Sequence, residues 1–202
     1  MKKILFLIVM FCGTALSTYA DDKGNAVVRS LAAAVKELGN YDVSFSVTGG
    51  ESNIEGNYTV VGRGYTMRVG DVVEVYCDGK LRYEINNEYK EISIDNVNTS
   101  EHNILNNPVD GLDFVSDEYH PQLLSDNSRE SVVRLTAANG SANDNMVVDV
   151  TVDSKSHLPR RIEYVIANDR VVITINDIRR TTAPLARFDA SCYKDYDIID
   201  FR

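Results

Sequence analysis

Apolar residues follow two different periods along the chain, and the first of these is helical. Near the N-terminus, five apolar residues lie three or four positions apart or side by side: Val28, Leu31, Ala32, Val35 and Leu38. This spacing places them on one face of an α-helix. Asn25 is a suitable N-cap for that helix, and Gly39 is suited to end it. The pattern predicts an amphipathic helix whose apolar side lies on another apolar surface.

From Tyr41 onward the period changes to two. Apolar and polar residues alternate in short runs, which cover residues 41–48, 54–60, 65–69, 73–77, 81–85, 133–137, 146–153, 158–166 and 171–175. Strands with one buried face show this alternation. Residues typical of hairpin turns separate the runs: Gly49-Gly50, the segment 62–64, Asp78-Gly79, Asn86-Asn87, Asn139-Gly140 and Asn168-Asp169.

Between residues 96 and 131 the alternation fails. Apolar residues are scattered there among many polar ones. We expect a short helix from about Val109 to Phe114, with Pro108 near its start. A long irregular insert in a compact domain often forms a lid over a binding site. A surface loop without a role fits the sequence equally well.

Together these elements predict a mainly β protein with helices (α+β). About ten strands, each with one apolar side, would form an unclosed antiparallel β-barrel or a strongly curved sheet. The N-terminal helix and the central helical insert would cap its open side. The sequence shows no repeat, low-complexity tract or linker, so we expect a single domain.

The first twenty residues have the features of an export signal. Lys2 and Lys3 precede an apolar run, and Thr18 and Ala20 suit a signal peptidase that cuts before Asp21. The apolar run is shorter than the ~20 residues of a membrane span, so an uncleaved anchor is the weaker alternative. We therefore expect residues 1–20 to be a signal peptide and residues 21–202 to be one exported domain.

The charge of the exported part is strongly negative. Without Lys2 and Lys3 it has 19 basic and 30 acidic side chains, a net charge of −11. Acidic residues are spread along the whole chain, which argues against binding to nucleic acid or to anionic membranes. The same charge helps to keep a protein with apolar surfaces in solution.

No pattern of catalytic or metal-ligating residues emerges from the sequence. His102, His120 and His157 are isolated in polar segments, and none lies at the spacing of a metal site. We therefore expect no enzyme, no cofactor and no metal. Cys77 and Cys192 would be exported into an oxidising compartment, where they could form a disulfide or be two free thiols.

The apolar side of the predicted sheet is the main feature with functional potential. Its side chains either fill an ordinary core or leave room for a hydrophobic ligand, and alternation alone fits both. If a cavity exists, we expect these residues to line it: Val28, Leu31, Val35, Val43, Phe45, Val47, Tyr58, Val60, Met67, Val75, Tyr83, Ile85, Leu105, Leu112, Phe114, Val148, Val150, Ile162, Tyr164 and Ile173.

Several short motifs also follow one another in a characteristic order. An apolar strand over residues 73–77 is followed by Asp78-Gly79-Lys80 and the aromatic strand 81–85. Further motifs are Asn106-Asn107-Pro108, Leu158-Pro159, the strand 172–178 and the terminal run 188–202. Because these motifs follow one another in this order, the chain resembles a distant branch of the LolA-like family of outer-membrane lipoprotein carriers. The resemblance covers nearly all of its exported part.

The resemblance implies an unclosed β-barrel capped by helices, which carries acyl chains of lipoproteins across the periplasm. It implies an inner-membrane ABC transporter and an outer-membrane acceptor as partners of a periplasmic monomer. A family arginine after the second strand helps to hold the helical lid closed, and Arg63 is its nearest match here, followed by Arg68. The chain has no tryptophan, unlike better-known members. A non-catalytic lipid-binding or envelope-stress sensor module on the same fold is the alternative.

Release of a lipid from such a fold needs a competitor. Burial of an acyl chain is favourable by ~0.8 kcal/mol per methylene. For the lipid to leave, this binding free energy must be offset by a part of the protein that fills the cavity in its place. We expect the helix over residues 28–38 and the segment 105–115 to compete with the ligand as a lid.

Overall fold

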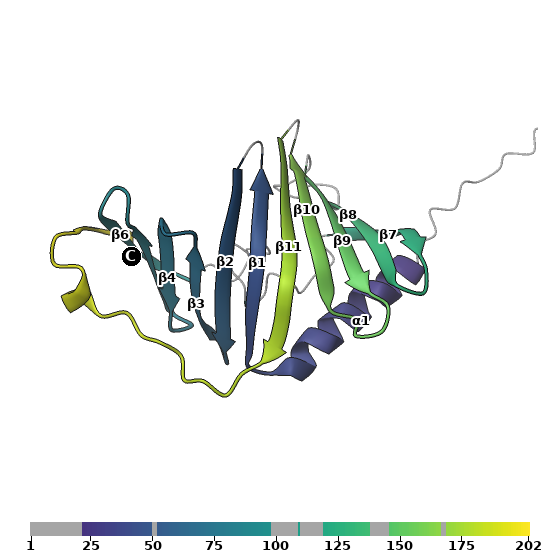
Figure 1. The fold of residues 1–202 in the computed structure, drawn as a ribbon, viewed down its shortest axis with the longest axis horizontal. Helices are drawn as coiled ribbons and strands as arrows, with labels where there is room; N and C mark the ends of the chain where they lie inside the picture. The colour runs from purple at the N-terminus through teal and green to yellow at the C-terminus, as the bar shows by residue number, and fades with distance from the viewer. Residues whose placement is uncertain (1–21, 50–51, 98–108, 110–118, 138–145, 167–168) are drawn as a thin grey trace, which may run out of the picture.

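The computed structural model describes residues 22–49, 52–97, 109, 119–137, 146–166 and 169–202. Within them lie one α-helix, twelve strands and a short 3₁₀ helix (Figure 1). In chain order the elements are α1 (Asp22–Leu38), β1 (Tyr41–Gly49), β2 (Ser52–Val61), β3 (Gly64–Val69), β4 (Val73–Cys77), β5 (Leu81–Asn86), β6 (Glu91–Asn96), β7 (Tyr119–Asp126), β8 (Glu130–Ala137), β9 (Met146–Asp153), β10 (Pro159–Ile166), β11 (Asp169–Arg180), η1 (Ala190–Cys192) and β12 (Asp197–Asp200).

All twelve strands belong to one sheet. Its order is β12-β6-β5-β4-β3-β2-β1-β11-β10-β9-β8-β7. Neighbours are antiparallel except β12, which is parallel to β6. The sheet is unclosed over the described residues, since β12 and β7 are its edges. The predicted fold class, a mainly β protein with a curved, unclosed antiparallel sheet and an N-terminal helix, is confirmed.

The topology follows from hairpins. β1 to β6 and β7 to β11 are two runs in which each strand pairs with the next, and the pair β1 and β11 joins the two runs at the centre (Figure 1). Among the predicted turns, residues 62–64, Asp78-Gly79 and Asn86-Asn87 lie between paired strands. The turns at Gly49-Gly50 and Asn168-Asp169 are described only in part, and the turn at Asn139-Gly140 lies outside the described residues.

The helix α1 begins earlier than the sequence predicts. The predicted N-cap, Asn25, lies inside the helix, whose first residue is Asp22. Because the first turn lies against β7, tertiary contact extends the helix, and the acidic Asp22 suits the positive end of its dipole. The predicted end is confirmed: the helix stops at Leu38, and Gly39 follows with a φ of 70°.

Three strands are absent from the sequence-based prediction: β6, β7 and β12, in which the apolar residues Ile198 and Ile199 are adjacent and do not alternate. β6 contains only two apolar residues, Ile92 and Ile94, so its alternation does not stand out. β7 lies in the segment expected to be a loop, and its Pro121 and the bulge between Leu123 and Ser125 break the alternation. Since β7 is an edge strand, it pairs only with β8 and tolerates a proline. The predicted helix from Val109 to Phe114 lies outside the described residues, apart from Val109 itself.

The C-terminal segment crosses from one half of the sheet to the other. After β11 the chain runs along the ends of the central strands and returns to β6, as Figure 1 shows. On the way, Leu185 lies directly over Gly64, where a Cβ atom would approach within 2.5 Å of the leucine side chain. The final apolar group of the sequence, Ile198, Ile199 and Phe201, lies at the β12 edge with exposed fractions of 57%, 37% and 63%.

Apolar side chains are buried in two separate clusters. The larger one lies on the side of the sheet that carries α1, and it extends from Leu31 of the helix and Leu135 of β8 to Val75 of β4. We call the face of the sheet that carries this cluster the inner face, and the opposite side the outer face. The smaller cluster consists of Ile85, Ile92 and Ile94, with five aromatic residues packed against it: Tyr76, Tyr83, Phe188, Tyr193 and Tyr196. We call it the aromatic cluster.

The described helix is not a membrane span. Over residues 22–38 and the rest of the described chain, no helix combines the length and apolar character that crossing a bilayer requires. The predicted signal peptide, residues 1–20, lies outside the described residues.

The close approach of α1 to β7 gives a testable prediction. A Cβ atom at Gly24 would lie 2.9 Å from the carbonyl oxygen of Pro121. A Gly→Ala substitution inside a helix usually stabilises it by about 1 kcal/mol. We expect Gly24→Ala to lower the free energy of unfolding instead, by ~1–3 kcal/mol, because two backbones must move apart. Urea denaturation measures the difference, and a stabilised variant would contradict the contact.

Candidate functional site

The inner face gathers most of the residues assigned to an apolar cavity from the sequence. Thirteen of them are buried members of the larger cluster: Val28, Leu31, Val43, Phe45, Tyr58, Val60, Met67, Val75, Val148, Val150, Ile162, Tyr164 and Ile173. Val35 and Val47 are partly buried and pack against this cluster. The structure therefore brings these side chains together on one side of the sheet. That they bind a ligand stays a prediction.

Two of the predicted residues lie on the other side. Val75 of β4 pairs with Glu84 of β5, whereas its neighbour Tyr76 pairs with Tyr83. Directly paired residues point to the same side of a sheet, and successive residues point to opposite sides. Tyr83 and Ile85 therefore face outward and belong to the aromatic cluster. Periodicity predicts which residues of a strand share a side, but it does not say which side that is.

Three further predicted residues, Leu105, Leu112 and Phe114, lie outside the described residues. Only Val109 is described in this stretch. It is partly buried and packs against the larger cluster.

The helix α1 is attached to the inner face along a narrow stripe. Its buried residues are Gly24, Val28 and Leu31, and it packs against β7 and β8 at one edge of the sheet. Figure 1 shows it on the β7–β10 half, away from β2 to β6. The C-terminal end of α1 is tied down by Arg180 of β11, whose Nη2 donates a hydrogen bond of 2.8 Å to the carbonyl oxygen of Glu37.

The two arginines predicted to hold the lid lie at β3 and not beside α1, and since most of the predicted lid segment 105–115 is outside the described residues, their role stays a prediction. Arg63 is exposed in the turn between β2 and β3. Arg68 is exposed on β3 and pairs with Glu74 of β4, with 3.0 Å between Nη2 and Oε2. The described contacts of Arg68 are thus with the sheet, and Arg180 is the arginine that contacts α1. No sequence signal pointed to Arg180, because the helix end and β11 are far apart along the chain.

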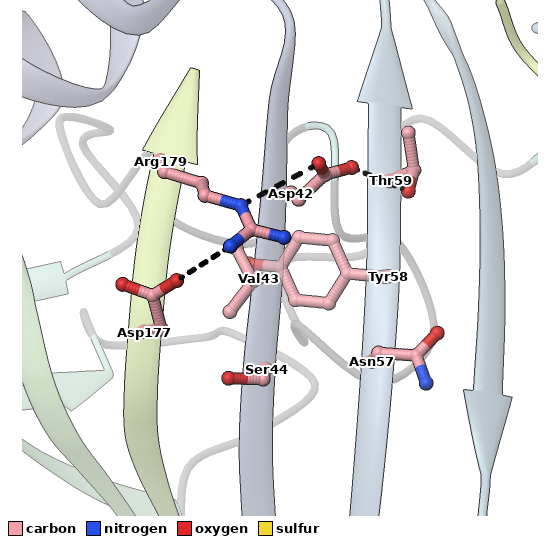
Figure 2. A pocket seen from close by; sticks show the side chains of 8 residues that line it. All are labelled: Asp42, Val43, Ser44, Asn57, Tyr58, Thr59, Asp177 and Arg179. Atoms are coloured by element: carbon pink, nitrogen blue, oxygen red, sulfur yellow. Dashed lines mark hydrogen bonds and ion pairs between the residues drawn. The ribbon is translucent and has the colours of Figure 1, made fainter. Parts of the chain in front are cut away.

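Tyr58 of β2 is the most unusual polar residue of the inner face. Its ring packs between Tyr41 and Phe45 of β1, at centroid distances of 6.2 Å and 5.9 Å, and Figure 2 shows it extending from β2 toward β1. The side chain is 1% exposed. Its hydroxyl has no hydrogen-bond partner among the described residues. Burial raises the pKa of Tyr58 well above 10.0, and the phenols of Tyr41 and Tyr164 raise it further.

The inner face becomes polar at β5. Arg82 and Glu84 point to this side, because they pair with Cys77 and Val75 of β4. The Nε of Arg82 donates a hydrogen bond of 3.2 Å to the hydroxyl of Tyr65, and the guanidinium also pairs with Glu84. Burial raises the pKa of Tyr65 to about 12 despite the nearby arginine. The apolar part of the inner face therefore ends at β4.

The outer face of the central strands is a network of compensated charges. Figure 2 shows the guanidinium of Arg179 between Asp42 and Asp177, at 3.9 Å and 3.6 Å from their carboxylates. Thr59 donates a hydrogen bond of 2.7 Å to Asp42. These residues surround a depression of about 280 Å³. Its charged groups neutralise one another, so we interpret these contacts as linking β1, β2 and β11 and not as a binding site.

A second outer-face network spans β10 and β11. Glu163 is 7% exposed, and it accepts hydrogen bonds from Arg161, at 2.7 Å, and from Arg170. Burial alone would raise the pKa of Glu163, but the two arginines outweigh that effect and hold the pKa below its ordinary value of 4.5. A buried carboxylate paired on both sides stabilises the strand register.

Both thiols are free in the structure. Cys77 is buried in β4 and Cys192 is exposed in η1, so of the two alternatives left open by the sequence the structure shows free thiols and no disulfide. Burial raises the pKa of Cys77. Within the described residues, no group of three or more histidine, cysteine, aspartate or glutamate side chains could hold a metal ion. His120 and His157 are exposed, and His102 lies outside that part of the chain.

Comparison with known proteins finds similar structures only. Neither a family model nor a curated protein sequence matches the chain. An uncharacterized conserved protein from Thermus thermophilus is similar over 88% of this chain and 99% of that chain, with a TM-score of 0.56 and 7% identity.

Two further similar structures carry informative names. A putative outer membrane lipoprotein-sorting protein domain from Vibrio parahaemolyticus is similar over 82% of this chain and 95% of that chain, with a TM-score of 0.44 and 11% identity. A LolA superfamily protein from Nitrosomonas europaea is similar over 84% and 96%, with a TM-score of 0.38 and 10% identity. At such identities the likeness concerns the fold alone.

The pairing of Glu163 predicts how stability depends on pH. Its pKa is lowered by folding, so its contribution is fully present above pH 4.5 and is lost as the pH falls through the folded-state pKa. We expect Glu163→Gln to lower the free energy of unfolding at pH 7 by ~1–3 kcal/mol and to flatten the acid limb. Denaturation from pH 7 to pH 3 measures both effects. Glu91→Gln, at an exposed position of β6, is the control and should leave them unchanged.

Proposed function

We propose that the protein is a periplasmic carrier that shields the acyl chains of lipoproteins on the inner face of its sheet and delivers them toward the outer membrane. The observation that supports this most is the combination of a wide apolar face with one narrowly attached helix. The order of the LolA-like motifs in the sequence points in the same direction. The proposed role is binding and transport, without catalysis.

The energies of the helix and of an acyl chain are comparable. α1 buries Val28 and Leu31 almost completely, and each such side chain contributes ~1.5–3 kcal/mol. Val27, Val35 and Leu38 add smaller contributions, because they are partly buried against the same cluster. An acyl chain gains ~0.8 kcal/mol for each methylene that it buries. A chain of ordinary length can therefore displace the helix, and the helix can dock again when the chain leaves. Gly39, with its φ of 70°, is the joint at which α1 meets β1.

This competition predicts the behaviour of a helix variant. Leu31→Ser removes an apolar side chain that is 1% exposed, which should weaken docking of α1 by ~2–4 kcal/mol. Since the docked helix excludes the ligand, we expect tighter binding of a fluorescent diacylated lipopeptide and faster amide hydrogen exchange in α1. Fluorescence titration and exchange mass spectrometry measure the two effects.

Ala33→Ser is the matched control for that variant. Ala33 lies on the exposed side of the same helix, so the substitution should change neither binding nor exchange. If Leu31→Ser behaved like Ala33→Ser in both measurements, α1 would not be a lid.

A transfer assay separates a carrier from a sensor module on the same fold. We expect the protein to accept a labelled lipoprotein from inner-membrane vesicles and to release it to outer-membrane vesicles. The inner-membrane ABC transporter and the outer-membrane acceptor are the partners that this role requires. Stable binding without release would favour the sensor, and native mass spectrometry without any bound lipid would contradict both roles.

A further inference from the structure

The hydroxyl of Tyr58 is a polar group in an apolar place. The ring lies among Tyr41, Phe45 and Val43 on the inner face, and 1% of the residue is exposed. No described residue makes a hydrogen bond to its oxygen. A buried hydroxyl without a partner destabilises a protein, and a phenylalanine would fill the same space without that cost. The buried place of this hydroxyl suggests that a bound ligand supplies its hydrogen-bond partner.

The surroundings of Tyr58 indicate the chemistry of that partner. The other groups that raise its pKa are the phenols of Tyr41 and Tyr164, and no described basic side chain contributes. A carboxylate or a phosphate would be left without a compensating charge there, which makes it unfavourable in an apolar interior. A neutral oxygen acceptor, such as an ester or amide carbonyl, needs only the hydrogen bond that the phenol can donate.

We infer that the Tyr58 hydroxyl donates a hydrogen bond to the ester or amide carbonyl of a bound acyl chain. This assignment rests on the proposed function and narrows it to acyl esters and amides, as opposed to free fatty acids. The aromatic side chains of Tyr41 and Phe45 flank the hydroxyl-bearing ring, so the carbonyl would sit within the apolar face and not at its polar boundary beside Arg82.

Three fluorescent probes test the inference: a lipopeptide with two ester-linked palmitoyl chains, its twin with two ether-linked hexadecyl chains, and a palmitate derivative with a free carboxylate. We expect the unaltered protein to bind the ester about tenfold more tightly than the ether, the difference that one neutral hydrogen bond supports. Tyr58→Phe should bind the ester and the ether equally, with the affinity for the ether unchanged. Tyr76→Phe removes a phenol from the outer face and should preserve the tenfold difference.

The outcomes separate this inference from the proposed function. Equal binding of ester and ether by the unaltered protein, or a difference that survives in Tyr58→Phe, would overturn the role of Tyr58 and leave the carrier proposal intact. If Tyr58→Phe lost affinity for palmitate alone, the neutral carbonyl would be overturned as the partner. If none of the three probes binds to the unaltered protein, both proposals fail.

Thermal denaturation without ligand completes the test. Because the hydroxyl lacks a described partner, we expect Tyr58→Phe to melt a few degrees higher than the unaltered protein, at unchanged circular dichroism. A lower melting temperature would show that the hydroxyl has a structural partner in the empty protein, and it would overturn the inference.

Discussion

The structure depends on the burial of apolar side chains, and the strands of the wide sheet bury them on different faces. From β1 to β4 and from β8 to β11 they point to the inner face, where α1 lies at one edge. At β5 and β6 they point to the outer face, and the C-terminal segment covers them. Within the described residues, two segments lie on this sheet: a helix from the start of the chain on the inner face, and an aromatic segment from its end on the outer face. Neither segment is close in sequence to all of the strands on which it lies.

This arrangement explains what the sequence could predict. Most of the hairpins, the end of α1 at Gly39 and the sets of residues in β1 to β4 that share a side follow from local periods and turn residues. The outward direction of Tyr83 and Ile85 depends on the register between β4 and β5, which alternation does not contain. β7 was hidden because an edge strand with Pro121 needs only one partner and no strict alternation. The tie between Arg180 and Glu37 joins residues 143 positions apart, so no local pattern could reveal it.

The inner face combines features that serve a stable core with features that do not. Most of its side chains are buried aliphatic groups that pack without directional bonds, as in any core. Tyr58 departs from that rule, because its hydroxyl is buried without a described partner. The helix also departs from it, since only two large side chains of its seventeen residues are fully buried, and Val27, Val35 and Leu38 are buried in part. A face built only for stability would have a phenylalanine in place of the phenol and a broader contact under the helix.

The parallel pairing of β12 with β6 constrains when this protein can finish folding. Ile198 pairs with Ile92, more than a hundred residues earlier, and Phe188 stacks on Tyr83 with 4.4 Å between ring centroids. Isoleucine and tyrosine side chains of β4 to β6 therefore stay exposed to solvent until the last part of the chain has been synthesised. Contacts of such long range form slowly. The β6 side of the sheet can therefore reach its final structure only when the last residues of the chain are available to pair with it.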